Sequence, residues 1–469
     1  MPEPRDEQLI IPKHLFIFEK LLENFKHLIM NRRKFITQSS NLSMAAGAWM
    51  LSPGVYTREK PRTSANEKIL VGLIGCNSMG WGILSLALRQ PNVECLGLCD
   101  IDSNVLNRRA EEVFKQYGKK PMLFDDYRKL LENKDLNAVI IGTPDHWHCL
   151  PMVEACMAGK EVYVEKPMAN TIGECTVMVK AARKYNRIVQ VGQQQRSGEH
   201  WQSAMSFIQS GGIGNLRKVH CWANFNYAIG QPKVPDEGVP AGVNFDRWLG
   251  PAPQRSFNKT RFHGSWRFFW DYGGGLVTDW GAHILDIALW VKNIKTAPLS
   301  VTATGGNYYS PEFNHECFDT LSVLYQLPDY TISWEHTAGI QTGPFGRAYG
   351  LAFAGNDATL VIDRAGWEIF PETEKGSYKV PMLPKRSGKE SHEEHVKNWL
   401  ECIREHKEPN CPVENGRLVA MYAHMGNMAL RTNSRLEWNE ANQNFGSNQA
   451  ANALIKPVYR KPWVFPEIV

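Results

Sequence analysis

Two features that often reveal the class of a protein are missing from this sequence. None of its ten cysteines belongs to a C-x-x-C pair, and several lie inside apolar runs such as VECLGLCD, residues 93–100. Beyond residue 65, no run reaches the roughly eighteen apolar residues that a membrane-spanning helix requires. We therefore expect buried free thiols rather than a zinc or dithiol centre, and no membrane insertion.

A surplus of charge is also missing outside the first residues. The formal net charge is +5, but residues 1–65 hold ten Lys and Arg against six Asp and Glu, and the rest of the chain holds 43 against 42. Such a nearly neutral body argues against nucleic acid as the main partner. The 469 residues, of which 43% are hydrophobic, suit a globular enzyme with more than one domain.

The basic residues near the N-terminus form a twin-arginine pattern. Arg32 and Arg33 precede the small and apolar residues of TQSSNLSMAAGAWMLSPGV, residues 37–55. This pattern predicts a twin-arginine export signal at about 30–54, with Met30 as the start of translation, and hence a periplasmic protein. A basic, disordered N-terminus on a cytoplasmic protein is the alternative.

After a leader and linker over residues 1–65, strand and helix patterns alternate up to residue 190. Short apolar runs that suit buried parallel strands are separated by helical patterns, and the connections are short. The expected strands are 68–75, 93–100, 138–144, 161–167 and 187–193. The expected helices are 81–90, 103–117, 149–159 and 172–186. This alternation predicts an α/β domain over 66–190, a Rossmann domain with a doubly wound parallel sheet.

The pattern changes beyond residue 190. Stretches such as LRKVHCWANFNY and DTLSVLYQLPDYTISWEHTAG are rich in β-branched and aromatic residues, whereas 199–210 and 273–293 keep a helical pattern. Long strands without intervening helices predict an α+β domain over 191–469 with a C-terminal tail. Its sheet is expected to be large, open and mainly antiparallel, with helices on one face.

A glycine-rich turn follows the first expected strand. Gly75-x-Asn77-x-x-Gly80 approximates the dinucleotide-binding pattern G-x-G-x-x-G, with Asn77 in place of the second glycine. Asparagine tolerates left-handed backbone better than most residues, so we expect the turn to form. The expected cofactor contacts in this turn are Gly75, Asn77, Ser78, Met79 and Gly80.

Asp100 closes the second expected strand. A carboxylate at this place accepts hydrogen bonds from ribose hydroxyls and repels a 2′-phosphate. The sequence therefore predicts an NAD site rather than an NADP site. A strand-ending aspartate that only caps the next helix is the alternative.

The segment GTPDHWH, residues 142–148, ends another expected strand at the edge where ligands of such sheets bind. Thr143, Pro144, His146 and His148 are expected to line the nicotinamide pocket. Histidines this close together rarely supply two ligands of one zinc ion, and no cysteine or carboxylate partner has ligand spacing. We expect no metal site here.

The segment VYVEKPMA places Glu165 and Lys166 at the same edge of the sheet. A lysine beside a cofactor can hydrogen-bond a reacting hydroxyl and stabilise charge as its proton leaves. Glu165 and Lys166 are also expected to contact the cofactor. Taken alone, Lys166 is equally compatible with an ordinary surface lysine.

The segment GGGLVTDWGAHILD supplies complementary groups. Asp279, His283 and Asp286 are spaced i, i+4 and i+7, which predicts one face of a helix that begins after three glycines. A histidine held by a carboxylate is a natural base for the proton of an alcohol. The glycines favour a functional interpretation over simple packing, because they allow the backbone to approach a ligand closely.

With these motifs the chain resembles the Gfo/Idh/MocA family, the oxidoreductases related to glucose–fructose oxidoreductase and inositol 2-dehydrogenase. The matching stretches are GLIGCNSMG, GTPDHWH, VEKP and GGGLVTDWGAH, and the resemblance extends from residue 67 to about 440. It implies an N-terminal Rossmann domain and a C-terminal open sheet often used for oligomer contacts, here in a dimer or tetramer. It also implies Lys166 as catalytic lysine, with Asp279 and His283 as the substrate-binding and proton-transfer pair. Asn77 departs from the family pattern.

The residues and the resemblance both predict an NAD(P)-dependent oxidoreductase that acts on CH–OH groups of carbohydrates. A secondary alcohol of a sugar or polyol gives its proton to His283, oriented by Lys166 and Asp279, while its hydride goes to the nicotinamide. Trp266, in the aromatic segment HGSWRFFWDY, and Arg196 are further expected substrate contacts.

Outside the cytoplasm no pool of nicotinamide cofactor exists to exchange with the enzyme. Twin-arginine export moves folded proteins, so we expect a tightly bound cofactor that each turnover returns to its starting state. A paired oxidation and reduction of two sugars meets this condition, and so does redox-neutral cleavage of a glycoside. Two further alternatives are a non-catalytic sugar-binding protein and a cytoplasmic dehydrogenase with exchangeable NAD.

Overall fold

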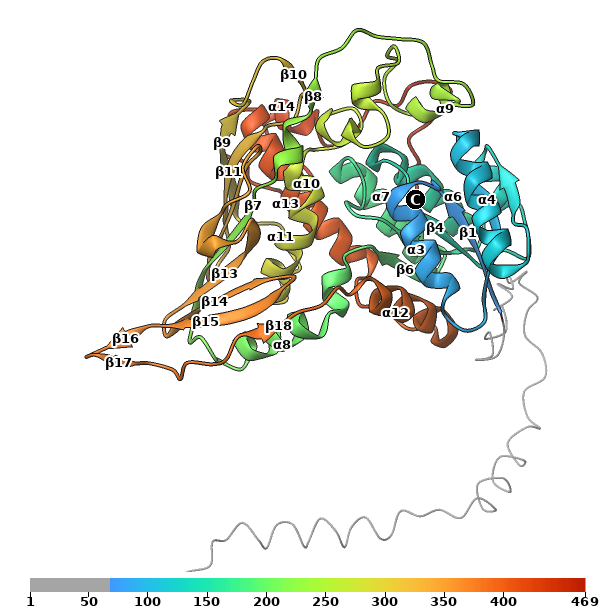
Figure 1. Ribbon diagram of the computed structural model, residues 1–469. Helices are drawn as coiled ribbons and strands as arrows, with labels where there is room; N and C mark the ends of the chain where they lie inside the picture. The colour runs from blue at the N-terminus through green and yellow to red at the C-terminus, as the bar shows by residue number, and fades with distance from the viewer. Residues whose placement is uncertain (1–67, 469) are drawn as a thin grey trace, which may run out of the picture. The chain divides into compact units, whose positions relative to one another are not determined.

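The computed structural model describes residues 68–468, which belong to one compact unit of the chain. The export signal and linker predicted within residues 1–65 lie outside the described residues. Two large sheets organise the described part, one of six strands and one of eight. Figure 1 shows both sheets with the helices that cover them.

The first sheet is parallel throughout, with the strand order β3-β2-β1-β4-β5-β6. Its strands are β1 (Ile69–Ile74), β2 (Val93–Cys99), β3 (Met122–Phe124), β4 (Ala138–Ile141), β5 (Glu161–Val164) and β6 (Val189–Val191). Its helices are α3 (Ser78–Leu88), α4 (Ser103–Tyr117), α5 (Tyr127–Leu131), α6 (Cys149–Met157) and α7 (Ile172–Lys184). The predicted Rossmann sheet is confirmed. Its order reverses between β1 and β4, and ligands of such sheets bind at the carboxyl ends beside that point.

Details of this half differ from the prediction at two places. The elements β3 and α5 were not predicted, because three and five residues are too few to show a periodic pattern. The strand expected over 138–144 ends at Ile141, and the chain continues into a short 3-10 helix, η1 (Asp145–Trp147). Pro144 has no N–H group for a ladder hydrogen bond, which favours leaving the sheet here.

The second sheet has the order β18-β15-β14-β13-β7-β12-β11-β9. Its strands are β7 (Leu216–Ala223), β9 (Ser300–Gly306), β11 (Thr320–Gln326), β12 (Thr331–Thr337), β13 (Tyr349–Gly355), β14 (Ala358–Asp363), β15 (Gly366–Pro371) and β18 (Arg386–Ser387). The pair β7 and β12 is parallel and the other pairs are antiparallel. The predicted large, mainly antiparallel sheet is confirmed. Short strands form two small sheets, β8 (Gln231–Pro232) with β10 (Phe313–Asn314), and β16 (Thr373–Glu374) with β17 (Ser377–Tyr378).

Helices cover one face of this second sheet. The helices of this half are α8 (Glu199–Gln209), α9 (Phe245–Leu249), α10 (Leu276–Asp279), α11 (Gly281–Trp290), α12 (His392–Glu405), α13 (Val413–Arg431) and α14 (Gln449–Asn452). Trp201 of α8, Leu285 of α11 and Tyr422 of α13 are buried in one core cluster with Val323 and Trp334 of the strands. Figure 1 shows α10, α11 and α13 on the same side of the sheet.

The chain beyond residue 190 also fills the core of the first sheet. Val396, Trp399 and Leu400 of α12 are buried in a cluster with Ile69 of β1 and Ile83 of α3. The amphipathic pattern of α12 therefore serves the parallel sheet, although the helix follows the antiparallel strands in the sequence. Side-chain packing joins the two halves directly.

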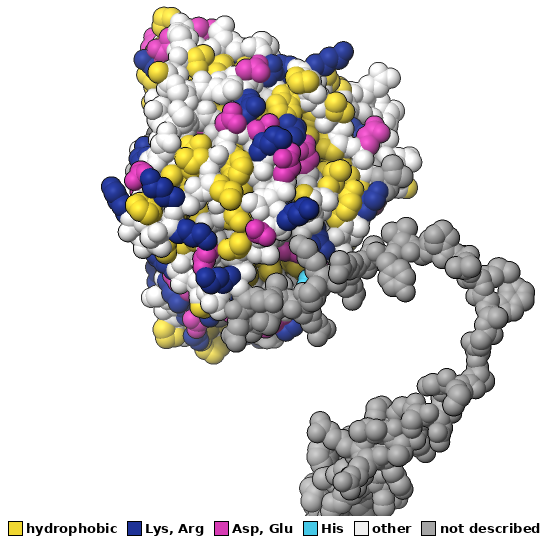
Figure 2. Space-filling view, turned by 90° about the vertical axis from the view of Figure 1, so that its right-hand side faces the viewer, with side chains coloured by type: hydrophobic (Ala, Val, Ile, Leu, Met, Phe, Trp, Pro, Cys, Tyr) yellow, Lys and Arg dark blue, Asp and Glu magenta, His cyan; other side chains and the backbone are white. Residues whose placement is uncertain are grey.

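The surface and the cysteines agree with the composition. All ten cysteines are buried and unpaired, which confirms the prediction of free thiols. Figure 2 shows Lys and Arg interspersed with Asp and Glu on the face it presents. Within residues 68–468, no helix combines the length and the apolar character needed to cross a membrane.

Candidate active site

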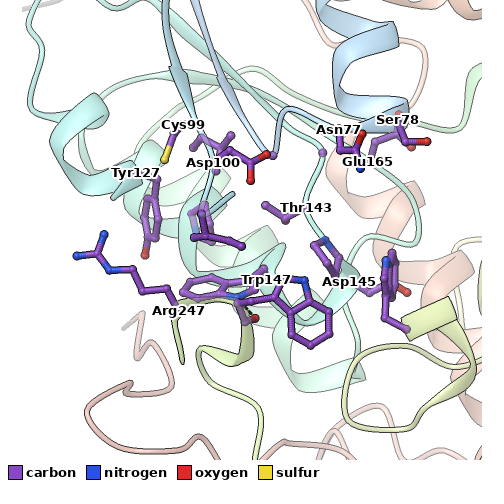
Figure 3. Close-up of a pocket in the computed structure, with 18 of the residues that line it drawn as sticks. Asn77, Ser78, Cys99, Asp100, Tyr127, Thr143, Asp145, Trp147, Glu165 and Arg247 are labelled. Carbon is purple, nitrogen blue, oxygen red and sulfur yellow. Dashed lines mark hydrogen bonds between the residues drawn. The ribbon is translucent and has the colours of Figure 1, made fainter. Parts of the chain in front are cut away.

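A large cavity lies at the carboxyl ends of β1, β2, β4 and β5, where the order of the parallel sheet reverses. Its empty volume is about 1330 Å³, open mouth included. The second half closes it with α9 and with the segment around Trp266. Nine of the predicted cofactor contacts line it, namely Gly75, Asn77, Ser78, Met79, Asp100, Thr143, Pro144, Glu165 and Lys166. Figure 3 shows Asp100 and Tyr127 on one side of this cavity and Glu165 on the other.

Glycines bring three backbone segments together beneath the cavity. A Cβ atom on Gly75, whose φ is +87°, would lie 2.8 Å from the backbone of Gly142. A Cβ atom on Gly80 would lie 2.2 Å from the carbonyl oxygen of Gly75. Gly80 therefore packs α3 against β1 rather than lining the cavity. Asn77 is extended (φ −94°, ψ 165°), and Ser78 has the positive φ of 39°, so the left-handed backbone expected at Asn77 lies elsewhere in the turn.

Two groups at the cavity have unused hydrogen-bonding capacity. The helix α3 begins after Asn77 without a side-chain cap, which leaves the N–H groups of its first turn for an anion. The hydroxyl of Thr143 is buried and has no partner within the described residues. The glycine turn, these donors and the nearby carboxylate of Asp100 fit a nicotinamide dinucleotide.

Asp100 organises the turn instead of capping a helix. Its Oδ2 accepts from the N–H of Cys76 at 2.7 Å, and its Oδ1 accepts from the N–H of Asp102 at 3.0 Å. The cap of α4 is Asp102, which accepts from the N–H of Asn104. Burial raises the pKa of Asp100. The interpretation of Asp100 as a helix cap is therefore wrong.

Further carboxylates stand at the Asp100 end of the cavity. Asp125 and Asp126 both line it. Arg247 of α9 reaches them from the second half, and its Nη1 lies 3.0 Å from Oδ2 of Asp125. Three carboxylates against one guanidinium leave this end with a surplus of negative charge, which disfavours a phosphate group there.

The two predicted pocket histidines lie behind the cavity wall. The ring nitrogens of His148 lie 2.8 Å from the carbonyl oxygen of Pro167 and 2.9 Å from that of Thr143, so the ring joins the turns after β4 and β5. His146 lies 3.1 Å from the carbonyl oxygen of Trp248 and borders a separate hollow. Burial lowers the pKa of both to about 4. No group of three His, Cys, Asp or Glu side chains that suits a metal occurs among residues 68–468.

Lys166 and Asp279 form a buried ion pair between the two halves. Nζ of Lys166 lies 2.5 Å from Oδ1 of Asp279, and each side chain is 10% exposed. Arg267 adds a second cation, with Nε 3.4 Å from the same oxygen. Burial raises the pKa of Asp279, but the charges of Lys166 and Arg267 outweigh it and hold this pKa at about 2. Asp279 is thus a carboxylate at every physiological pH.

His283 stands close to this pair without a carboxylate of its own. Its side chain is buried, and no hydrogen bond to its ring occurs within the described part of the chain. Burial, with the nearby charges of Lys166 and Arg364, holds the pKa of His283 well below its usual value. The contact expected from the i, i+4, i+7 spacing is absent there, because Asp279 is paired with Lys166.

The third residue of that helical face has another partner. Both oxygens of Asp286 accept hydrogen bonds from Arg196, at 2.7 to 2.9 Å, and both side chains are buried. Trp280, between α10 and α11, keeps helical dihedral angles, so the helical face continues across it. Arg196 does not line the cavity, and its Nε and Nη2 both donate to Asp286. Its role as a substrate contact stays a prediction, as the same cavity is not lined by Asp279 or His283 either.

Several site residues were not singled out from the sequence. Arg267 and Asp145 line the cavity, and the hydroxyl of Tyr227 donates to Oδ2 of Asp279 at 3.5 Å. Burial raises the pKa of Asp145 well above its usual value. Arg267 covers the ring of the predicted contact Trp266, which lines the cavity, at 4.4 Å. Arg267 and Asp145 lie inside the quoted motifs, whereas nothing in NFNY marked Tyr227 as special.

Comparison with known proteins gives a family and a fold. A Gfo/Idh/MocA model described as oxidoreductase family, NAD-binding Rossmann fold, matches residues 69–193. The companion model, the C-terminal alpha/beta domain, matches 208–310 and 377–465. Glycosyl hydrolase family 109 protein 1 of Shewanella sp. (strain ANA-3) is 27% identical over 191 residues, which is 38% of this chain and 40% of that relative. The chain thus spans well under half the length of this curated relative.

Two solved structures share the fold along nearly their whole length. The aldose-aldose oxidoreductase of Caulobacter crescentus, complexed with glycerol, has a TM-score of 0.60 at 19% identity. The match covers 79% of this chain and 100% of the oxidoreductase chain. A levoglucosan dehydrogenase, in complex with NADH and levoglucosan, has a TM-score of 0.59 at 18% identity. The match covers 79% of this chain and 99% of the dehydrogenase chain. The two family models, with the site geometry above, show that the chain belongs to the Gfo/Idh/MocA family of oxidoreductases.

Proposed function

We propose that this protein transfers hydride between a secondary alcohol of a sugar or polyol and a tightly bound nicotinamide cofactor. The observation that carries the proposal is the arrangement beside the cofactor cavity. Lys166 lies at its edge, fixed 2.5 Å from the carboxylate of Asp279, and the neutral ring of His283 lies one helical turn beyond Asp279.

Each of these three residues has its own part in moving the proton of the alcohol. The ammonium of Lys166 donates a hydrogen bond to the alcohol oxygen and stabilises the negative charge that develops on it. Asp279, ionised because its pKa is about 2, keeps that ammonium in place. His283 is neutral, and its ring has no hydrogen bond among residues 68–468, so it accepts the proton. A bound nicotinamide supplies the hydride chemistry.

The cofactor that suits the cavity best is NAD. Gly75, Ser78 and the uncapped first turn of α3 would hold the pyrophosphate, and Asp100 would accept from the adenosine ribose. Asp125 and Asp126 stand at the same end, so a 2′-phosphate would meet like charges. Glu165 and Lys166 would contact the nicotinamide end.

A carbohydrate is the substrate class that the surroundings favour. The names of two solved structures that share this fold refer to sugars or sugar derivatives. Trp266 and Arg267 form part of the cavity wall, and the hydroxyl of Tyr227 contacts Asp279. An indole face with hydroxyl and guanidinium donors beside it suits a ring with several hydroxyl groups.

Redox-neutral cleavage of a glycoside is the second candidate. The glycosyl hydrolase family 109 relative supports it, over 38% of this chain. In this reaction a ring hydroxyl is oxidised, the neighbouring C–H loses its proton, the aglycone leaves, water adds, and the ketone is reduced back to the alcohol. The sugar and the cofactor end in their starting oxidation states, so no external pool of cofactor is needed.

We also propose that the protein is exported by the twin-arginine pathway and works in the periplasm as a dimer or tetramer. The support for export is the sequence of residues 30–54 alone. An enzyme in that compartment needs a retained cofactor, and a cavity lined by residues of both halves favours retention.

The test of this proposal begins with the nucleotide content of protein purified from cells. Denaturation should release close to one NAD(H) per chain, measured by chromatography and mass spectrometry. The loaded enzyme is then given pairs of sugars, and separately aryl glycosides, without added cofactor. Exchange of oxidation state between sugars indicates the first reaction, and release of the aglycone with solvent deuterium in the sugar indicates the second. A chain that neither contains nor binds a nicotinamide dinucleotide would contradict both.

A further inference from the structure

The last residues of the chain return from the second half to the Rossmann half. Residues 456–468, here called the C-terminal strap, follow α14 and run toward α6 and α7 (Figure 1). The hydroxyl of Tyr459 donates to Oε1 of the buried Glu174 in α7 at 2.7 Å. Ile468, 9% exposed, packs in the hydrophobic core that contains residues of α6 and α7. The strap is thus anchored near both of its ends.

The strap also fastens the loop that carries α9. Arg460 donates from Nη1 to a carboxylate oxygen of Asp246 at 2.7 Å and from Nε to the carbonyl oxygen of Gly250 at 3.1 Å. Its own N–H donates to the carbonyl oxygen of Pro251 at 2.9 Å. Because α9 carries Trp248 and Arg247 into the cavity wall, the strap holds one side of the cavity closed.

Between these anchors, Trp463 contributes its indole to the cavity. The ring of Trp463 packs edge to face on that of Trp147, with the two ring centroids 4.8 Å apart. The guanidinium of Arg128 lies 4.7 Å from the ring centroid of Trp463. Trp147 is fixed in turn, since its Nε1 donates to the carbonyl oxygen of Trp248 at 2.8 Å. Three tryptophans from three distant segments therefore meet at one wall of the cavity.

This aromatic wall belongs to the end of the cavity that Asp100 marks. Tyr127, which lines the cavity, lies 6.0 Å from Trp147 between ring centroids. Figure 3 shows Tyr127, Asp100 and Arg247 on one side, with Trp147 between them and Asp145. In this fold the carboxylate after the second strand accompanies the adenosine ribose, so the wall faces the space of the adenine. Aromatic rings are suited to burying a planar base.

We propose that the C-terminal strap, through Trp463, completes the adenine site and sets how long the dinucleotide stays bound. This inference rests on the proposed function, because it takes a nicotinamide dinucleotide as the ligand. The adenine end leaves the cavity only when the strap and the α9 loop separate from Trp147. The strap thereby supplies the retention that an enzyme without an external cofactor pool requires.

The experiment compares Trp463→Ala with Val464→Ala in the full chain. Val464 is the next residue and is 75% exposed, so it controls for changes in the strap that do not reach the cavity. Dissociation of NAD, and the affinities of ADP-ribose and nicotinamide mononucleotide, are measured for both variants and the wild type. Trp463→Ala should release NAD about 10- to 100-fold faster and lower the affinity for ADP-ribose by a similar factor. Nicotinamide mononucleotide, which lacks adenine, should bind as in the wild type.

Each other outcome has a distinct meaning. Equal retention of NAD by the wild type and Trp463→Ala overturns the role of the strap and leaves the oxidoreductase proposal standing. An equal loss of affinity for ADP-ribose and for nicotinamide mononucleotide also overturns it, because the substitution has then disturbed the whole cavity and not the adenine site in particular. A wild type that binds no dinucleotide rejects both proposals. If Trp463→Ala does not fold, Trp463→Phe decides, with NAD release expected to be intermediate between the wild type and the predicted alanine value.

Discussion

Nζ of Lys166 lies 2.5 Å from Oδ1 of Asp279, although 113 residues separate the two in the sequence. The lysine is the second residue after β5 of the parallel sheet, and the aspartate ends α10 of the other half. Their contact joins the two halves at the edge of the cavity that Lys166 lines, one helical turn from the buried His283. Because both side chains are nearly buried, removing Asp279 leaves the charge of Lys166 uncompensated, whereas removing Lys166 leaves Asp279 with Arg267 as its remaining cation.

Replacing Lys166 by alanine should reduce turnover by about 10²- to 10⁴-fold. The alcohol oxygen then lacks its cationic donor, and the pKa of Asp279 rises because one of the two cations that lower it is gone. Steady-state rates with any active sugar measure the effect. Lys180→Ala, on the exposed face of α7, is the control. Unchanged turnover in Lys166→Ala would remove this lysine from the mechanism.

The pH profile of the wild type should show no acid limb near the usual pKa of histidine. Burial, together with the charge of Lys166, lowers the pKa of His283 well below that value. The ring therefore stays neutral as the pH falls through about 6.5 and still accepts a proton. Turnover rates measured from pH 8 down to 5.5 test this. The rate of His283→Asn is expected to be about 10²- to 10⁴-fold lower than that of the wild type across the whole range. A wild-type limb with a midpoint near 6.5 would argue against His283 as the base.

Replacing Asp100 by asparagine should raise the affinity for NADP relative to NAD by roughly tenfold. The amide oxygen can still accept from the N–H of Cys76, while the hydrogen bond from the N–H of Asp102 and one negative charge are lost. Asp125 and Asp126 remain, and for that reason we do not expect a full reversal of preference. Binding titrations of both nucleotides measure the ratio. Asp135→Asn, at an exposed position away from the cavity, should leave it unchanged.

Replacing Arg196 by methionine should lower the free energy of unfolding by about 3–5 kcal/mol, because Asp286 then remains buried and unpaired. The double variant Arg196→Met with Asp286→Leu should recover part of this loss, since no lone charge is left. Urea denaturation measures both effects. The KM of folded enzyme is expected to stay within about twofold, because Nε and Nη2 of Arg196 already donate to Asp286. A raised KM without loss of stability would restore Arg196 to the substrate site.

Local patterns in the sequence were enough for the fold and for many of the residues that line the cavity. Apolar runs such as ILVGLI, each followed by a helix, predicted the parallel sheet, because strands buried on both faces must be apolar throughout. Gly75 and Asp100 were identified because a tight turn and a strand-ending carboxylate depend on neighbours in the chain. The spacing of Asp279, His283 and Asp286 likewise predicted a shared helical face.

The tertiary structure decided which side chains meet across that framework. Helical spacing placed the carboxylates of Asp279 and Asp286 near His283. In the structure Asp279 pairs with Lys166 and Asp286 with Arg196, and these partners are 113 and 90 residues apart in the sequence. Trp463 joined the cavity wall only because the end of the chain returns to the Rossmann half. Hydrophobic periodicity and turn-forming residues act over a few neighbouring positions, so the elements that they specify can be predicted from the sequence. Ion pairs and aromatic contacts between distant segments form where packing brings them together, and that is settled only by the fold.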